Sequence, residues 1–254
     1  MRNHCILGKG NHANPRTNLY IFPHSGGMPG MYMEWGRRLD RVNIWGVQYP
    51  GRGSRISEAP CLTLADMVAD VLTQAEFVQP YILMGHSLGA IVAYEIAARV
   101  PKGNLPAGLI VSAMSSPDCK IVEPGSSQIN SDALLEIVRK AQPATLANLD
   151  SVSEFMEHSI EVLRNDIKAA ENYVCNPAQI LPVPIVFMGG KEDSIPSREQ
   201  EGWGNFTVAQ FECHVFKGGH FYFQEDREEF FRSLNMIIDR LSTLQCAGRG
   251  ISVI

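Results

Sequence analysis

The sequence predicts an α/β fold in which a mostly parallel, twisted sheet is flanked by helices on both faces. Short apolar runs of strand type alternate with segments whose apolar residues recur at helical spacing. This alternation is typical of parallel strands joined by crossover helices. The chain has 254 residues, of which 45% are hydrophobic, so it can bury a full core. We therefore expect a single domain over residues 1–254 that carries a helical insertion.

The first half of the chain supplies the first predicted strands and helices. A loose polar lead-in over residues 1–17 is expected to precede them. Strands are predicted over residues 18–22, 42–49, 81–86 and 107–113. Helices are predicted over residues 31–39, over 64–75 behind the N-cap Thr63, and after residue 87, where alanines recur.

The alternation stops between residues 115 and 182, a span too long for an ordinary connection. One helix is expected to begin near Ser131, and a second carries a regular apolar face. The residues of that face are Met156, Ile160, Leu163, Ile167 and Ala170. We interpret the span as a helical insertion, either a lid over the active site or a packing element. The lid is favoured because the insertion leaves the sheet at the edge that carries the serine motif described below.

The last third of the chain returns to strands and helices. Strands are predicted over residues 184–190 and 209–216, with a helix at 196–203 between them. A final helix is expected to bury one side on the sheet. The residues of that side are Phe230, Phe231, Leu234, Ile237, Ile238 and Leu241. Residues 246–254 are expected to form a tail.

A Gly-x-Ser-x-Gly pattern stands at the end of the central predicted strand. Gly85, Ser87 and Gly89 follow an apolar run and precede the alanine-rich helix. This is the strand–turn–helix context in which a nucleophilic serine is held on a strained turn. Glycines at both ends of the pattern allow the strand and the helix to approach closely. A glycine-rich turn with an ordinary surface serine is the alternative interpretation of the pattern alone.

A serine hydroxyl needs a base, and the base needs an acid to orient it. Asp193 and His220 each follow a late strand, so we expect both at the sheet edge where Ser87 lies. The chain order Ser, Asp, His is that of the α/β hydrolases. We therefore predict Ser87 as nucleophile, His220 as base and Asp193 as acid. The oxyanion is expected to be held by the backbone N–H groups of Leu88 and Ser25.

Several neighbouring residues compete for these roles or extend them. Asp118 also follows a strand and is the alternative acid, while His86 is a rival base beside Ser87. His24, Gly26, His86 and Arg52 are the candidate substrate-binding residues. Arg52 and Arg55 lie in one loop. They are either solvated charges of a turn or contacts to a ligand or partner.

Composition limits the class of function. The net charge of −5 and the pI near 5.8 argue against a general nucleic-acid binder. The six cysteines are scattered singly, so neither a zinc site nor a redox pair is suggested. The predicted chemistry needs no metal or cofactor. No apolar run resembles a signal peptide or a membrane span. A cytoplasmic protein with reduced thiols is the expectation.

Four further segments carry a resemblance to a known family. Phe22-Pro-His-Ser-Gly-Gly27 resembles a Phe-Pro-His-Ala-Gly-Gly loop, with Ser25 in place of the common alanine. The others are Gln48-Tyr-Pro-Gly-Arg-Gly-Ser-Arg55, Leu163-Arg-Asn-Asp166 and Gly218-Gly-His-Phe221. Together they resemble the type II thioesterases, stand-alone α/β-hydrolases associated with nonribosomal peptide and polyketide synthesis. The similarity extends from residue 19 to about residue 241.

The resemblance implies a substrate and a partner. The substrate would be an acyl group on the phosphopantetheine arm of a carrier protein, hydrolysed through an acyl-serine by a protein that is expected to be monomeric. In the stand-alone enzymes the acid follows the lid, as Asp193 does here, whereas in integrated domains it follows the elbow, as Asp118 does. An acidic carrier would need a basic patch. The candidates are Arg37, Arg38 and Arg41, or Arg52 and Arg55.

Three other functions are compatible with parts of this pattern. A small-molecule esterase or lipase would use the same triad, and an acyltransferase would use the same acyl-serine. A carrier-binding module without turnover would need neither, so Ser87, Asp193 and His220 argue against it. The sequence leaves the acyl group, the docking surface and the motion of the lid open.

Overall fold

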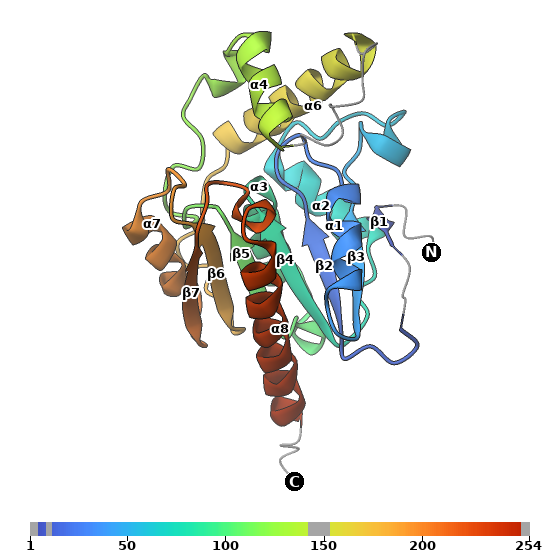
Figure 1. Ribbon diagram of the computed structural model, residues 1–254, viewed down its shortest axis with the longest axis vertical. Coiled ribbons are helices and arrows are strands. Elements are labelled where there is room, and N and C mark those ends of the chain that lie inside the picture. The colour runs from blue at the N-terminus through green and yellow to red at the C-terminus, as the bar shows by residue number, and fades with distance from the viewer. Residues whose placement is uncertain (1–4, 9–11, 142–152, 250–254) are drawn as a thin grey trace.

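A computed structural model describes residues 5–8, 12–141 and 153–249 (Figure 1). Its centre is a seven-stranded sheet in the order β1-β3-β2-β4-β5-β6-β7. Every neighbouring pair is parallel except β1 with β3. The strands are β1 Ile6–Leu7, β2 Thr17–Phe22, β3 Val42–Val47, β4 Tyr81–His86, β5 Leu109–Ser112, β6 Ile185–Gly190 and β7 Phe211–Phe216. The predicted α/β class is confirmed.

Helices cover both faces of this sheet. The α-helices are α1 Gly30–Met33, α2 Leu64–Gln74, α3 Leu88–Arg99, α4 Ser131–Ala141, α6 Ser153–Glu171, α7 Ser197–Glu201 and α8 Arg227–Arg249. Short 3₁₀ turns are η1 Glu34–Arg37, η2 Gly53–Arg55, η3 Lys102–Asn104, η4 Ser126–Gln128, η5 Gly202–Phe206 and η6 Tyr222–Gln224. One core cluster contains apolar residues of α2 and α3, and the other contains those of α1, η1 and α8.

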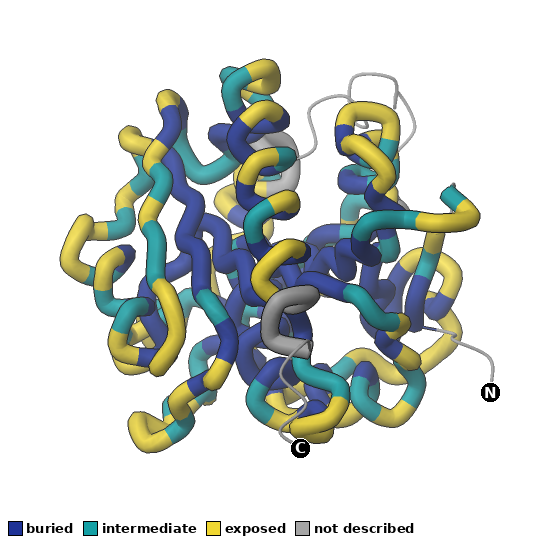
Figure 2. Tube along the Cα trace, turned by 90° about the horizontal axis from the view of Figure 1, so that it is seen from below, coloured by how far each residue is buried: buried dark blue, intermediate teal, exposed yellow. Residues whose placement is uncertain are grey.

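The strands are buried because both faces of the sheet are covered. All six residues of β4 are buried, as are those of β2 and β6, and Figure 2 shows buried positions concentrated in the central strands. Apolar runs without alternation are expected of such strands. In the described part of the chain, no helix is long and apolar enough to cross a membrane.

Helix α2 shows how a local signal sets an element. The Thr63 side chain accepts a hydrogen bond from the Asp66 N–H at 3.1 Å, and the Asp66 carboxylate accepts one from the Thr63 N–H at 3.2 Å. This reciprocal capping box satisfies two donors at the start of the helix. Leu64, Met67 and Val71 recur at helical spacing in α2, and all three are buried.

Three expectations about local structure were wrong in part. The lead-in is not uniformly loose, because Ile6 and Leu7 pair with β3 and Cys5 is fully buried. A two-residue strand is too short to produce a recognisable alternation. The predicted helix over 31–39 divides into α1 and η1. Helix α8 continues to Arg249 into the predicted tail, and residues 250–254 lie outside the described part.

The described part of the insertion between β5 and β6 contains the helices α4 and α6 and the 3₁₀ turn η4, joined by irregular segments. Helices α4 and α6 pack together through Leu134 and Leu163, with Ile160 and Ile167 beside them. Among the described residues of the insertion, Leu181 forms an isolated bridge and no longer strand is present. Residues 142–152 lie outside the described part. Figure 1 shows α4 and α6 together at one end of the sheet.

Candidate active site

Ser87 stands on a strained turn between β4 and α3. Its φ of 54° and ψ of −128° are rare for a residue with a side chain, and its N–H donates to the Ser112 carbonyl at 2.8 Å. The two glycines of the motif are required sterically. A Cβ at Gly85 would overlap the Gly89 carbonyl, and a Cβ at Gly89 would overlap the Phe22 carbonyl. The close approach expected from the sequence is therefore present.

The loops after β6 and β7 bring a carboxylate to a histidine. His220 Nδ1 lies 2.9 Å from Asp193 Oδ2, and the Asp193 side chain is only 6% exposed. The Asp193 Oδ1 atom accepts the Ser194 N–H at 2.7 Å, which fixes the carboxylate further. The backbones of the two loops are in close contact, since a Cβ at Gly190 would overlap the Gly219 carbonyl. This geometry can orient the His220 imidazole and stabilise its charged form.

The structure distinguishes the two candidate acids by their partners. Asp118 is exposed, and its carboxylate accepts a hydrogen bond from Ser116 Oγ at 2.7 Å. Asp193 is the carboxylate that contacts His220.

His220 lies beside the turn that carries Ser87. The centre of its ring is 5.1 Å from that of His86, the residue before Ser87. Within the described residues no hydrogen bond joins the Ser87 hydroxyl to His220. Catalytic hydrogen bonds of this kind often tighten only when substrate is bound.

Two further histidines are buried at the site and uncharged. Burial, with His220 nearby, lowers the pKa of His86 well below its usual value, and burial lowers the pKa of His24 to about 3. His86 Nδ1 lies 2.9 Å from Ser112 Oγ, which is 2.8 Å from the Tyr222 hydroxyl. His24 Nδ1 lies 3.0 Å from the Tyr32 hydroxyl. A strongly lowered pKa makes His86 a weak base, so it is a poor rival to His220.

The loop after β2 (residues 23–29, the β2–α1 loop) contains a tight turn near Ser87. The Gly27 N–H donates to the His24 carbonyl at 2.8 Å, and Gly26 has a φ of 74°. A positive φ at the third residue is the signature of a type II turn and favours glycine there. Ser25 is the second residue of this turn. Leu88 begins α3, where the first backbone N–H groups have no partner within the helix.

Arg52 is buried in an ion pair. Its side chain is 4% exposed and that of Asp166 only 1%. The two make a bidentate pair, with both nitrogen–oxygen distances at 2.6 Å. Asp166 also accepts the Gly26 N–H at 2.7 Å. Sequence reasoning missed this link, although the spacing of Asp166 from Leu163 placed both on one side of the insertion helix.

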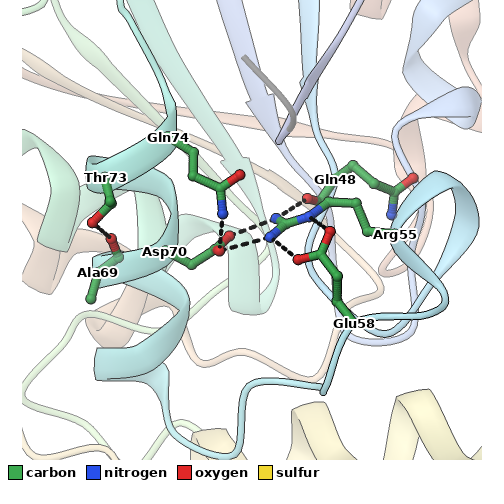
Figure 3. Close-up of polar contacts among 7 residues, drawn as sticks. All are labelled: Gln48, Arg55, Glu58, Ala69, Asp70, Thr73 and Gln74. Atoms are coloured by element: carbon green, nitrogen blue, oxygen red, sulfur yellow. Dashed lines mark hydrogen bonds and ion pairs between the residues drawn. The ribbon is translucent and has the colours of Figure 1, made fainter. Parts of the chain in front are cut away.

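Arg55 lies in a second ion-pair cluster, which Figure 3 shows. The Arg55 cluster comprises Arg55, Gln48, Glu58, Asp70 and Gln74. The guanidinium donates to Asp70 at 2.6 and 2.8 Å, to Glu58 at 2.6 and 2.9 Å, and to the Gln48 carbonyl at 3.0 Å. The side chain is 3% exposed. The prediction that Arg55 and Arg52 are solvated or free for docking was therefore wrong, because each guanidinium is buried against carboxylates.

The other predicted basic cluster does not form one patch at the site. Arg38 pairs with Glu228 and lies over the Phe231 ring, 5.2 Å from its centre. Arg41 directly precedes β3, so it lies at the opposite edge of the sheet from Ser87. Arg37 is exposed. A partner that reaches Ser87 would not contact Arg41 from the same side.

Comparison with known proteins shows which family the chain resembles. The thioesterase domain family model matches residues 17–238. The chain is 30% identical over 235 residues to thioesterase PikA5 of Streptomyces venezuelae, covering 87% of this chain and 81% of that protein. It is 31% identical to a probable cadicidin biosynthesis thioesterase of Streptomyces griseus, covering 81% of this chain but 58% of that protein.

Solved structures give the same result. The type II thioesterase BorB from the borrelidin biosynthetic cluster has a TM-score of 0.81 and 26% identity, covering 94% of this chain and 99% of that one. ClbQ from the colibactin pathway has a TM-score of 0.78 and 29% identity, covering 90% and 99%. The resemblance to type II thioesterases is thus confirmed at the level of sequence and fold. The chain belongs to the thioesterase family, whose members are hydrolases acting on thioesters.

Proposed function

We propose that the chain hydrolyses acyl thioesters through an acyl-serine, with Ser87, His220 and Asp193 as the catalytic triad. The observation that carries the proposal is the 2.9 Å contact between His220 Nδ1 and Asp193 Oδ2 beside the strained turn of Ser87. Asp193 keeps the other ring nitrogen of His220 available as the base.

The reaction runs in two balanced halves. Ser87 Oγ attacks the thioester carbonyl while His220 takes the hydroxyl proton, and the carbon–sulfur bond then breaks as His220 returns that proton to the leaving thiolate. A water molecule next attacks the acyl-serine and gives its proton to His220. His220 passes this proton to Ser87 as the ester bond breaks, which releases the carboxylic acid.

The oxyanion of each step needs two donors. The Leu88 N–H, at the start of α3, has no acceptor within the helix and lies at the positive end of the helix dipole. The Ser25 N–H in the β2–α1 loop is the second proposed donor. The loss of one such donor typically costs about 10²–10³ in kcat.

The neutral, buried rings of His24 and His86 are the proposed wall of the acyl site, with Gly26 beside them. Their centres are 5.7 Å apart, and each is within 5.3 Å of the Phe221 ring. Arg52 contributes indirectly, because its guanidinium is occupied by Asp166.

The proposed substrate is an acyl group on the phosphopantetheine arm of a carrier protein. It is supported by the similar structures, among them BorB from the borrelidin biosynthetic cluster and ClbQ from the colibactin pathway of nonribosomal peptide and polyketide synthesis. We further propose that the enzyme acts as a cytoplasmic monomer. The five cysteines that the structure describes as free thiols fit a reducing compartment.

The test uses a panel of acylated carrier proteins and intact-mass detection of the released carrier. The protein is expected to remove the acyl group, and Ser87→Ala is expected to abolish removal and labelling by a fluorophosphonate. Asp193→Asn should lower kcat by about 10⁴, the loss seen when a triad acid is neutralised. Asp118→Asn is the matched control and should retain activity. Preferential turnover of p-nitrophenyl esters, with no turnover of any carrier, would instead identify an esterase.

A further inference from the structure

Asp166 joins the insertion to two loops of the sheet at one buried point. It lies on α6, yet its carboxylate binds the Arg52 guanidinium of the loop after β3 and the Gly26 N–H of the β2–α1 loop. Leu163, one turn earlier on α6, packs on the same loop, since a Cβ at Gly26 would lie 3.2 Å from its Cβ. Helix α6 therefore contacts the turn twice, through the carboxylate of Asp166 and through the apolar side chain of Leu163.

The bond to Gly26 decides how the turn is built. A turn of residues 24–27 can adopt type I or type II, and the two differ by a flip of the peptide between its second and third residues. That peptide joins Ser25 to Gly26, and Asp166 accepts its N–H. The flip would turn this N–H away from the carboxylate. Asp166 thereby holds the turn in the form with the positive φ of Gly26.

Arg52 explains why a carboxylate is tolerated at this depth. Burying an unpaired carboxylate is costly, whereas a bidentate guanidinium repays much of that cost. The Arg52 guanidinium also lies over the Tyr49 ring, with its carbon 5.4 Å from the ring centre. The Arg52 guanidinium thus holds the Asp166 carboxylate at a place where its Oδ2 atom accepts the Gly26 N–H. A charged acceptor makes the stronger hydrogen bond to a backbone N–H.

We propose that Asp166 is a positioning residue that fixes the β2–α1 turn for catalysis, so that the site is complete only with α6 docked on this loop. The proposal rests on the oxyanion role proposed above for the neighbouring Ser25 N–H. Asp166 acts through the turn and touches neither the substrate nor the reacting atoms. The insertion would then help to stabilise the transition state as well as cover the site.

The obvious substitution, Asp166→Ala, leaves Arg52 buried without a counter-ion and tests folding more than position. Two double variants avoid this because both remove the buried charges. Arg52→Met with Asp166→Asn retains an oxygen that can accept the Gly26 N–H. Arg52→Met with Asp166→Leu keeps the side chain branched at the same carbon but has no acceptor. The two proteins are compared by thermal unfolding, by steady-state kinetics on an acyl thioester, and by amide exchange of ¹⁵N-labelled Gly26.

The Leu double variant is expected to have a kcat about tenfold or more below that of the Asn double variant, with KM within about twofold. Its Gly26 amide should exchange at least about tenfold faster, and the two unfolding temperatures should be close. Equal kcat values in the two variants, or a difference confined to KM, would overturn the proposal. So would equal protection of the Gly26 amide.

Failure of the proposed function gives a different result. If the unmodified protein cleaves no thioester, the rate of fluorophosphonate labelling of Ser87 replaces kcat, because phosphonylation also develops charge on an oxygen in that site. A slower labelling rate in the Leu variant supports the positioning role even then. Equal labelling rates and equal Gly26 exchange overturn it.

Discussion

The burial of His24 predicts a dependence of stability on pH that one substitution should remove. Burial, together with the nearby charges of His220 and Arg52, lowers the pKa of His24 from 6.5 to about 3 in the folded protein. In the unfolded chain the imidazole takes up a proton as the pH falls through 6.5, while in the folded protein it stays neutral until about pH 3. Its contribution is therefore fully present above pH 6.5 and is lost as the pH falls from 6.5 towards 3.

The size of the effect follows from a single proton. Each pH unit in this window costs about 1.4 kcal/mol of unfolding free energy, so acidification from pH 7 to 4.5 should cost about 2.6 kcal/mol through His24. His24→Asn removes the titration and keeps an amide that can bond to the Tyr32 hydroxyl. The stability difference between the parent and the variant should therefore shrink by about 2.6 kcal/mol over this range.

The measurement is urea unfolding followed by tryptophan fluorescence at half-unit steps from pH 4.5 to 7.5. Other groups titrate equally in both proteins, so the difference between the two curves isolates His24. Tyr32→Phe is the control, because it removes the hydroxyl bond at 3.0 Å but leaves the imidazole buried. It should keep the slope of the parent. Parallel curves for the parent and His24→Asn would refute the reasoning.

Three further substitutions test structural features of the fold by urea unfolding, two of them with a matched control. Arg55→Met should cost about 2–4 kcal/mol of unfolding free energy, because it removes the buried partner of the Asp70 and Glu58 carboxylates, of which Glu58 is partly exposed. A loss of stability below about 1 kcal/mol would contradict a structural role for Arg55. Gly89→Ala should cost about 3 kcal/mol or more, because its methyl group meets the carbonyl at the end of β2, whereas Gly103→Ala, with open space around it, should be nearly neutral. Thr63→Ala should cost about 1 kcal/mol through the lost cap. Thr73→Ala, within the same helix, should cost less, and the reverse order would argue against the capping box.

The alternation of strands and helices along the chain and the serine motif were predictable because their signals are local. Apolar runs, the alanines after Ser87 and the cap at Thr63 each lie within one element. The sequence offered Asp193 and Asp118 as candidate acids because both follow parallel strands, and Asp193 is the one that contacts His220. Parallel strands present their carboxyl ends at one edge, which makes such pairs visible in the order of the chain.

The burial and ion pairing of Arg52 and Arg55 were not predictable in the same way. Arg52 and Arg55 share a loop and a composition typical of solvated turns, yet both are buried. The counter-ion of Arg52 lies 114 residues away on the insertion, and a sequence pattern does not encode that pairing. The presence of β1 depends likewise on tertiary packing, which outweighs weak local preference.

The place where the insertion joins the sheet has a consequence for engineering. It leaves after β5 and returns before β6, and these neighbouring strands pair directly from Leu109 with Ile185 to Ser112 with Met188. Its exchange would therefore leave the pairing of β5 with β6 in place and would remove only the isolated bridge of Leu181 with Thr207. A loop of different length costs little entropy. A transplanted insertion from a relative must therefore reproduce the contacts that this one makes with the main core, among them the hydrogen bond from the Tyr173 hydroxyl to Glu95. It must carry a carboxylate where Asp166 stands, or Arg52 must be replaced with it.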